Sequence, residues 1–554
     1  MSPVLVTLIC FVLYLGGYYF YSKHLAFKVF RLDPTRTTPA HTLYDSVDYV
    51  PTQRFVLFGH HYASIAGLSP MLGPAIAVIW GWLPALIWVV VGTIFIGAVH
   101  DFSAMVVSVR AKGMSVGKVA EKIIGFRAKI LFHLIIFFLI ALAMGVFVHV
   151  TATLLGTTYH PEAIYPSGTL MLLALVVGLL VYKYGFSLAK VTIVAFFLTM
   201  GSIWMGLKMP LLDLGLGQWS IILLSYGFLA SVLPVWLLIQ PRDYINSLLL
   251  YAGLISIFAG FFLLQPQFSA PVLQIYPEGA PPMFPFVFIV IACGSISGFH
   301  GLVSSGTTAK QINSESDTRF IGYGGMIGES LLGLVSVLAC TAGFSSSSLW
   351  HSHYQSWALA QGLGANMKAF IDGCGHFLNQ LGIPFPLAKA FIALIAISFA
   401  LTTLDSAVRL LRFNITEMSE TLRLPILGNR YASSALAVLT IGFFAFYEIG
   451  GRAAGLALWQ LFGTTNQILA SLTLLAVTLY LMQKRRNYWF TAVPMLFMMI
   501  TTLVAMTVKM VDFWNLKSYV LLCVGGIILI LSLWLAVEAI SRILEDKRSR
   551  LVKG

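Results

Sequence analysis

The sequence has few charged residues for its length. Of its 554 residues, 10% are Asp, Glu, Lys or Arg, whereas 58% are hydrophobic. A soluble chain carries roughly 25% charged residues. This shortage excludes a soluble enzyme, a nucleic-acid-binding protein and a disordered scaffold. Because about 20 apolar residues cross a bilayer once, the composition instead predicts a protein with many transmembrane helices.

Motifs for catalysis and cofactor binding are also lacking. The five cysteines are scattered and contain no Cys-x-x-Cys pair, so they indicate no disulfide framework. No P-loop, Ser-His-Asp or zincin spacing occurs, so the sequence predicts neither ATP-driven pumping nor catalysis. We therefore expect no enzymatic activity and no bound cofactor.

Long apolar runs predict an all-α polytopic membrane protein with about 15 transmembrane helices. The first run, residues 3–21, has no basic residue before it and no small-residue cleavage site. It is predicted to be a retained helix rather than a signal peptide. The later runs cover residues 55–80, 84–109, 128–156, 169–184, 189–207, 220–240, 245–264, 284–304, 321–345, 385–413, 433–447, 455–482, 489–508 and 516–540.

The Lys and Arg residues are concentrated in alternate loops. If the N-terminus lies outside, all but six of the 34 fall in predicted cytoplasmic loops, in agreement with the positive-inside rule. The net charge of +13 is therefore predicted to orient the chain in the inner membrane with a cytoplasmic C-terminus. It is expected to contact anionic lipid rather than nucleic acid. The six exceptions are Lys208, Lys368, Lys389, Arg452, Lys509 and Lys517.

The second predicted span contains residues that break helices. Gly67, Pro70, Gly73 and Pro74 fall near its middle; proline removes a backbone donor and glycine permits unwound backbone. At bilayer depth such a break is tolerated only inside protein or beside an aqueous cavity. The free N–H groups after it favour an anion, and the free carbonyls before it favour a cation. A proline kink without a ligand is the alternative.

A related break is predicted around Pro234, in the span at 220–240. Pro234 and Pro70 lie at nearly equal offsets from the starts of their spans. Spans two to six and seven to eleven then form two sets of five that enter the membrane from opposite sides, as in secondary transporters with inverted repeats. The predicted organisation is an accessory N-terminal helix (1–25), a cytoplasmic linker (26–54), two repeats (55–207 and 220–414) and accessory C-terminal helices with a cytoplasmic tail (430–554).

Ionisable residues inside spans are candidates for function, because a charge at mid-helix costs about 2.5–3.5 kcal/mol. His60 and His61 precede the break in span two, and His300 lies in a Ser- and Gly-rich tract from Cys293 to Thr308. Histidine titrates near physiological pH, which suits a proton carrier. Close packing of small residues is the alternative explanation of the tract.

Two further groups have simpler explanations. Asp405 and Arg409 are four residues apart on one predicted helix and are expected to form a structural ion pair. The outer loop between spans ten and eleven contains Asp372, Cys374 and His376, residue types that can bind metal. One short loop is little evidence, so we predict no metal site there.

Several motifs are spread over most of the chain. They are Asp48–Thr52, Phe58–Gly67 followed by Gly73 and Pro74, Gly97–Phe102, Gln240–Tyr244, Gly298–Gly301, Leu401–Ser406 and Leu461–Gln467. Together they resemble the carbon starvation protein CstA family. The resemblance implies a secondary transporter of the amino acid–polyamine–organocation superfamily with a LeuT-like core of five plus five helices. Members of the family are linked to uptake of peptides and of pyruvate during carbon starvation.

The same resemblance implies where an ion binds. In a LeuT-like fold a sodium site would lie between the break in span two and span nine. The expected region contains Ala63, Ala66, Ser304 and Ser305.

The sequence therefore predicts a symporter that couples uptake of a small carboxylate, with pyruvate favoured, to H⁺ or Na⁺. His60, His61 or His300 would carry the proton. Arg242 and Asp243 would border the second broken helix as a gate, with contact to the substrate as the alternative role of Arg242. A di- or tripeptide transporter on the same scaffold and a membrane nutrient sensor are the alternatives. The predicted substrate-binding residues are Ser64, Gly67, Ser69, Met71, Gly73, Ser297 and Gln240.

Overall fold

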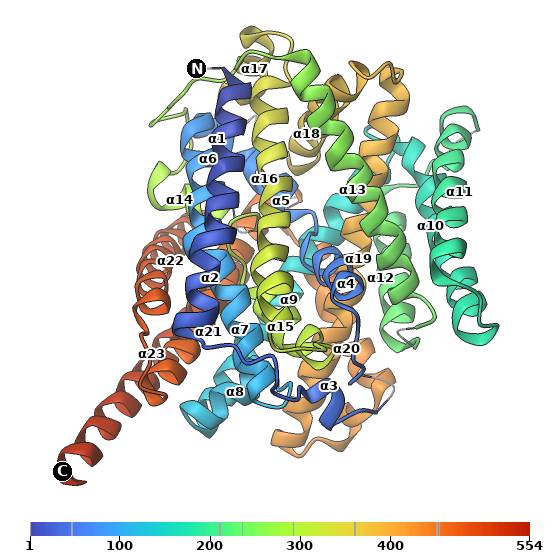
Figure 1. The fold of residues 1–554 in the computed structure, drawn as a ribbon. Coiled ribbons are helices and arrows are strands. Elements are labelled where there is room, and N and C mark those ends of the chain that lie inside the picture. Colours follow the sequence, from blue (N-terminus) through green and yellow to red (C-terminus); the bar gives the residue numbers. More distant parts are fainter. Residues whose placement is uncertain are drawn as a thin grey trace.

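The protein is a bundle of long apolar helices with its N- and C-terminal ends on opposite sides (Figure 1). The computed structural model describes residues 2–45, 48–209, 212–234, 236–291, 293–358, 360, 362–449, 452–453 and 455–553. Within these ranges every element is helical except a small hairpin of β1 (Glu448–Ile449) and β2 (Arg452–Ala453). By length and composition, eleven of the described helices can cross a membrane, or up to twelve with a bent pair. This confirms the prediction of an all-α polytopic membrane protein.

Burial separates the helices that face lipid from those of the core. The N-terminal helix begins at Pro3, where proline needs no amide partner, and only 28% of its most apolar stretch is buried. The corresponding value is 89% for both α19 (Phe385–Leu422) and α21 (Gly455–Gln483), which therefore form the core. The N-terminal helix consists of α1 (Pro3–Gly16), η1 (Gly17–Tyr21), α2 (Ser22–His24) and η2 (Leu25–Val29), and α3 (Pro39–Thr42) follows it.

The predicted break in the second span is confirmed. Helix α4 (Arg54–Ile65) and helix α5 (Ser69–Ala77), extended by η3 (Val78–Trp80), are bent by 48° relative to each other. Residues 66–68 between them are not helical, and Pro70 stands in the first turn of α5, where its missing N–H costs nothing.

The next helices follow the predicted spans closely. They are α6 (Trp82–Ile87), η4 (Trp88–Gly97) and α7 (Ala98–Arg110), then α8 (Val116–Ile123), α9 (Phe126–Leu155), η5 (Pro161–Ala163), α10 (Ile164–Gly178), η6 (Leu179–Lys183) and α11 (Leu188–Lys208). Figure 1 shows α10 and α11 side by side at the edge of the bundle.

The predicted break in the span at 220–240 is wrong. Helix α12 (Leu216–Val232) ends there, and α13 (Ile239–Leu264) begins as a separate membrane-spanning helix. Pro234 ends a helix because the residue before a proline avoids helical backbone. The second interrupted segment lies further on, between α14 (Met283–Val290) and α15 (Gly298–Gly306), where Gly294 has a φ of +83° that favours glycine.

The remaining helices complete the bundle. They are η7 (Thr308–Lys310), η8 (Arg319–Tyr323), α16 (Gly324–Ala342), α17 (Ser347–Tyr354), α18 (Leu363–Asn379), η10 (Pro425–Gly428), α20 (Arg430–Ala445), α22 (Trp489–Asn515) and α23 (Tyr519–Lys553).

Packing relates two sets of five segments. Several contacts occur in matching pairs. Helix α5 packs on α16, and in the same way α15 packs on α7. Helix α13 packs on α4 and α19, and in the same way α21 packs on α15 and α9. Both α12 and α20 contact α9 and α19. One set is thus α4–α5, α6–α7, α9, α12 and α13, and the other is α14–α15, α16, α19, α20 and α21. Two sets of five agree with the predicted core, but this packing starts the second set at Met283 rather than at residue 220.

Candidate functional site

A small pocket lies beside the first interrupted helix. It has a volume of about 70 Å³ and is enclosed by α4, α15, α19 and the start of α13. Its lining combines cationic and hydroxyl side chains with few acids. The lining residues are Asp48, Val50, His60, Ser64, Ile239, Gln240, Val303, Gly306, Thr307, Lys310, Gln311, Ser406, Arg409, Leu410 and Phe413.

Two cations give the pocket its electrostatic character. Lys310 Nζ is 3.8 Å from Asp48 and faces the ring of Tyr49. Arg409 donates to the carbonyls of Ala230 and Leu233, at 2.8 and 2.5 Å, which are left free where α12 ends. A pocket with two positive side chains and hydroxyl donors is suited to a small carboxylate.

His60 links the pocket to a buried charge network. Its Nδ1 is 3.2 Å from Asp243 Oδ2, and Asp243 is also paired with Arg242 at 3.1 Å. The His60 side chain is partly exposed, whereas Asp243 is buried. His60 is therefore a protonatable group between the pocket and an acid of the protein interior.

The predicted ion pair between Asp405 and Arg409 does not form. Asp405 is paired instead with Arg242, and Tyr226 Oη donates to the same carboxylate at 2.6 Å. Arg409 lies one helical turn beyond Asp405, but its guanidinium is turned to the end of α12. A partner from α13 thus replaces the neighbour on the same helix.

The predicted substrate residues divide into two groups. Ser64 and Gln240 line the pocket, and Tyr182 donates to Gln240 at 3.0 Å. Gly67, Ser69, Met71, Gly73 and Ser297 are buried at the two interruptions and do not line it.

The two interruptions contact each other. A Cβ added to Gly73 of α5 would lie 2.7 Å from the carbonyl of Val290, the last residue of α14. A Cβ on Gly294 would lie 3.3 Å from Cα of Pro70. Glycine at these two positions permits the unwound backbones to touch.

The predicted sodium-site residues are all buried, but a further hydroxyl lies nearer the break. Ser304 Oγ has no hydrogen-bond partner, whereas Ser305 Oγ donates to Gly301 at 2.6 Å. Thr403 Oγ1 of α19 is buried without a partner and lies 2.6 Å from where a Gly67 Cβ would be. Sequence reasoning missed Thr403, although it lies inside the Leu401–Ser406 motif.

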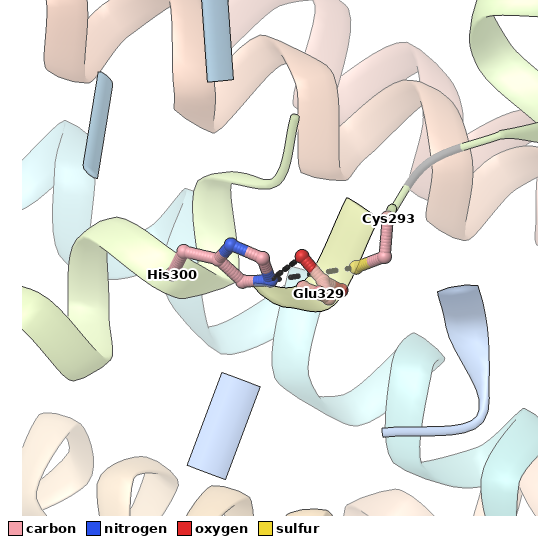
Figure 2. Close-up of side chains that lie close together, drawn as sticks. All are labelled: Cys293, His300 and Glu329. Carbon is pink, nitrogen blue, oxygen red and sulfur yellow. Dashed lines mark hydrogen bonds and ion pairs between the residues drawn. The ribbon is translucent and has the colours of Figure 1, made fainter. Parts of the chain in front are cut away.

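A cluster of ionisable residues lies in the protein interior. His300 Nδ1 of α15 is 2.9 Å from Asp101 Oδ2, and His100 Nδ1 is 2.7 Å from the other oxygen of Asp101. His300 Nε2 is 3.3 Å from Glu329 Oε2 of α16 and 3.8 Å from Cys293 Sγ. Figure 2 shows the Cys293, His300 and Glu329 side chains directed toward one another. Their donor atoms lie within 4.8 Å of one another, close enough to hold a metal ion.

His61 lies in the same part of the interior. Its Nδ1 is 2.9 Å from Thr308 Oγ1, and its Nε2 has no hydrogen-bond partner. The side chain is fully buried and does not line the pocket. Of the two predicted α4 histidines, only His60 thus reaches the pocket.

The residues of the predicted outer loop are not arranged as metal ligands. They lie on α18, where Asp372 is paired with Lys368 and Lys389. Cys374 is fully buried, and the His376 ring stacks on Phe385. Each side chain therefore has a different environment.

Comparison with known proteins identifies the family. The model of the carbon starvation protein CstA family matches residues 2–348 and 352–505. The peptide transporter CstA of Escherichia coli is 31% identical over 91% of this chain and 80% of its own length. The pyruvate/proton symporter BtsT of Escherichia coli is 30% identical over 90% of this chain and 80% of its own length. The peptide transporter CstA of Bacillus subtilis is 30% identical over 94% of this chain and 91% of its own length.

Two solved structures also match over much of their length. The nucleobase-cation-symport-1 family transporter Mhp1 has a TM-score of 0.47 and 12% identity, covering 93% of this chain and 96% of that one. MhsT in complex with L-phenylalanine has a TM-score of 0.46 and 13% identity, covering 82% and 99%. On the match of the family model to nearly the whole sequence, the chain belongs to the carbon starvation protein CstA family.

Proposed function

We propose that the chain is a secondary active transporter of the inner membrane that takes up a small carboxylate, with pyruvate favoured, together with a proton. The observation that carries this proposal is the pocket between α4, α13, α15 and α19, which places Lys310 and Arg409 around a small volume next to His60. The substrate carboxylate would bind Lys310 and the N–H groups of Arg409 that do not donate to the end of α12, with Ser64 and Gln240 completing its hydrogen bonds.

The two interrupted helical segments are the parts of the protein that we expect to move during transport. Helices α4 and α15 both line the pocket and both belong to interrupted segments. Rocking of such segments against a scaffold is the usual basis of alternating access. The Arg242–Asp405 pair would hold the start of α13 against α19 on one side of the pocket and serve as part of the gate.

His60 is the proposed proton carrier. It lines the pocket and its Nδ1 contacts the Asp243 carboxylate, so it stands between the substrate and a buried acid. Sodium remains the second candidate ion, because the partnerless Thr403 hydroxyl lies beside the break at residues 66–68, which includes Ala66. Hydroxyl and carbonyl oxygens together are suitable cation ligands.

A peptide is the second candidate substrate, since two of the relatives described above are named peptide transporters. The volume of about 70 Å³ favours the smaller substrate, because pockets for drug-sized ligands measure roughly 300–1,000 Å³. A role in carbon starvation is part of the proposal and follows from the family name.

The test is uptake of labelled pyruvate into proteoliposomes containing the full chain. A proton gradient and a sodium gradient are imposed separately, and protein-free liposomes serve as the control. We expect accumulation driven by the proton gradient that excess unlabelled pyruvate abolishes and excess dipeptide leaves unchanged. Accumulation that dipeptide blocks would favour the peptide transporter, and binding without accumulation would favour a sensor.

A further inference from the structure

Three potential metal ligands converge in the interior, outside the lining of the pocket. Cys293 belongs to the unwound segment between α14 and α15, His300 to α15 and Glu329 to α16. Figure 2 shows the His300 ring facing both the Glu329 carboxylate and the Cys293 thiol. All three residues are buried, with exposed fractions of 5%, 0% and 0%. None of them lines the pocket assigned to the substrate.

The distances match the edges of a metal coordination polyhedron. Zinc binds imidazole and carboxylate at about 2.0–2.2 Å and thiolate at about 2.3 Å, so tetrahedral ligands lie about 3.3–3.6 Å apart. The distance from His300 Nε2 to Glu329 Oε2 is 3.3 Å, and that from Nε2 to Cys293 Sγ is 3.8 Å. The two edges that meet at His300 Nε2 are therefore within a few tenths of an ångström of these values, and the third edge, between Cys293 and Glu329, is no longer than 4.8 Å.

The surroundings of His300 are those of a metal-bound imidazole. Its other nitrogen, Nδ1, lies 2.9 Å from Asp101 Oδ2, and Asp101 is held in turn by His100. Metal-ligating histidines commonly donate the second ring N–H to a carboxylate, which fixes the tautomer. With its proton on Nδ1, His300 directs the lone pair of Nε2 toward Glu329 and Cys293.

Glu329 provides a separate observation. Its carboxylate is fully buried, and neither oxygen has a hydrogen-bond donor in good geometry; its neighbours are His300 Nε2 and the backbone of Gly294. A buried carboxylate left in this state is costly. A cation placed between Glu329, Cys293 and His300 would satisfy the carboxylate.

We propose that Cys293, His300 and Glu329 bind one divalent transition-metal ion of the zinc class. A thiolate and an imidazole select Zn²⁺ or Co²⁺ over Ca²⁺ and Mg²⁺, which prefer oxygen ligands. Binding releases the thiol proton and gives a site that is neutral apart from Asp101. The ion ties the unwound segment after α14 to α16 and so fixes the shape of the second interruption.

The experiment measures metal on the full chain purified in detergent. The protein is stripped with a chelator, dialysed against Co²⁺ and examined by metal analysis and by near-ultraviolet absorption, where thiolate-to-cobalt charge transfer appears. We expect about one Co²⁺ per chain, a charge-transfer band, and displacement of Co²⁺ by Zn²⁺. Cys293→Ser should lose the band, and Glu329→Gln should weaken binding at least tenfold.

Cys340→Ser is the matched control, because Cys340 is also a fully buried thiol of α16 that takes no part in the cluster. It should retain both the band and the stoichiometry. Removal and re-addition of metal is also measured on the wild-type chain. The proposal can therefore be tested even if a variant fails to fold. Absence of cobalt binding by folded wild-type protein, or an unchanged band in Cys293→Ser, overturns the proposal. Because the readout is metal content, it is independent of whether pyruvate is transported.

Discussion

Arg242, in the first turn of α13, is paired with Asp405 of α19, 163 residues further along the chain. Both side chains are fully buried, and Tyr226 Oη lies 2.6 Å from each of them. The pair joins one helix from each set of five at the side of the pocket where α13 begins. A charge buried in this way must remain paired.

Arg242→Met should destabilise the protein strongly, because it leaves Asp405 buried without its cation. Removal of one partner of a buried ion pair costs about 3–5 kcal/mol, whereas replacement of both by apolar residues is often nearly neutral. The double variant Arg242→Met/Asp405→Leu should therefore recover part of the loss. Thermal unfolding in detergent of Arg242→Met, Asp405→Leu and the double variant gives the coupling free energy between the two residues. Additive effects would show that the two residues act independently.

Gly67→Ala should impair transport, because the first interruption has no room for a methyl group. The added Cβ would lie 2.6 Å from Thr403 Oγ1 and 2.9 Å from Phe147. Forcing an extra carbon into such a site costs about 1–3 kcal/mol. The control is Gly201→Ala in α11, where a Cβ would meet nothing within 4 Å. Uptake at the wild-type rate by Gly67→Ala would mean that α4 and α5 can shift without affecting transport.

The parts of the fold that were predictable depend on local sequence. Long apolar runs determine the helices, and the interruption between α4 and α5 follows from Gly67 and Pro70 alone, since both act on their own backbone. Ser64 and Gln240, two of the predicted substrate residues, line the pocket, and their contact with substrate stays a prediction.

The second interruption was misplaced because it contains no proline. The break was predicted at Pro234, but this proline lies between two separate helices, α12 and α13. The real break, after α14, depends on Gly294 and on close packing against Pro70, which is far away in sequence. Likewise, sequence reasoning paired Asp405 with Arg409 because it detects neighbours on one helix, whereas the observed partner comes from α13. Contacts between residues far apart in sequence determine both the position of the second interruption and the partner of Asp405.

Lys310→Gln should weaken binding of a carboxylate substrate. Lys310 lines the pocket with 23% of its side chain exposed, and its competing acid, Asp48, is 3.8 Å away. A hydrogen bond to a charged group contributes about 1.5–3 kcal/mol, so the apparent KM should rise about tenfold or more. Lys310→Arg keeps the charge and should restore most of the affinity. Concentration dependence of initial uptake rates measures both, and an unchanged KM in Lys310→Gln would remove Lys310 from the binding site.

Asp372 should make the stability of α18 sensitive to acid. Burial opposes ionisation, but Lys368 and Lys389 hold the pKa of the Asp372 carboxyl below its ordinary value. Because the pKa of Asp372 is lower in the folded state, its ionised carboxylate stabilises the fold at pH values above the unfolded pKa of about 3.9. This stabilisation is lost as the pH falls through the folded pKa. Asp372→Asn should thus lower the Tm at pH 7, and the difference from wild type should shrink below about pH 4. A difference that stays constant with pH would show that the ion pairs contribute little.

His60→Gln should separate substrate binding from proton coupling. His60 is the histidine that both lines the pocket and contacts an acid, Asp243 at 3.2 Å. Glutamine can keep a hydrogen bond to that acid but cannot carry a proton at physiological pH. We expect the variant to lose accumulation driven by a proton gradient while it retains counterflow, in which external labelled substrate exchanges for internal unlabelled substrate without an ion gradient.

The control for this variant is His24→Gln, since His24 is exposed at the end of α2 and does not line the pocket. It should keep both activities. Retention of gradient-driven accumulation by His60→Gln would exclude His60 as the proton carrier. Loss of counterflow together with accumulation would assign His60 to substrate binding instead. Only loss of accumulation alone fits a residue that transfers the driving force, because exchange uses substrate binding and reorientation of the loaded carrier but needs neither the return of the empty carrier nor net movement of the proton.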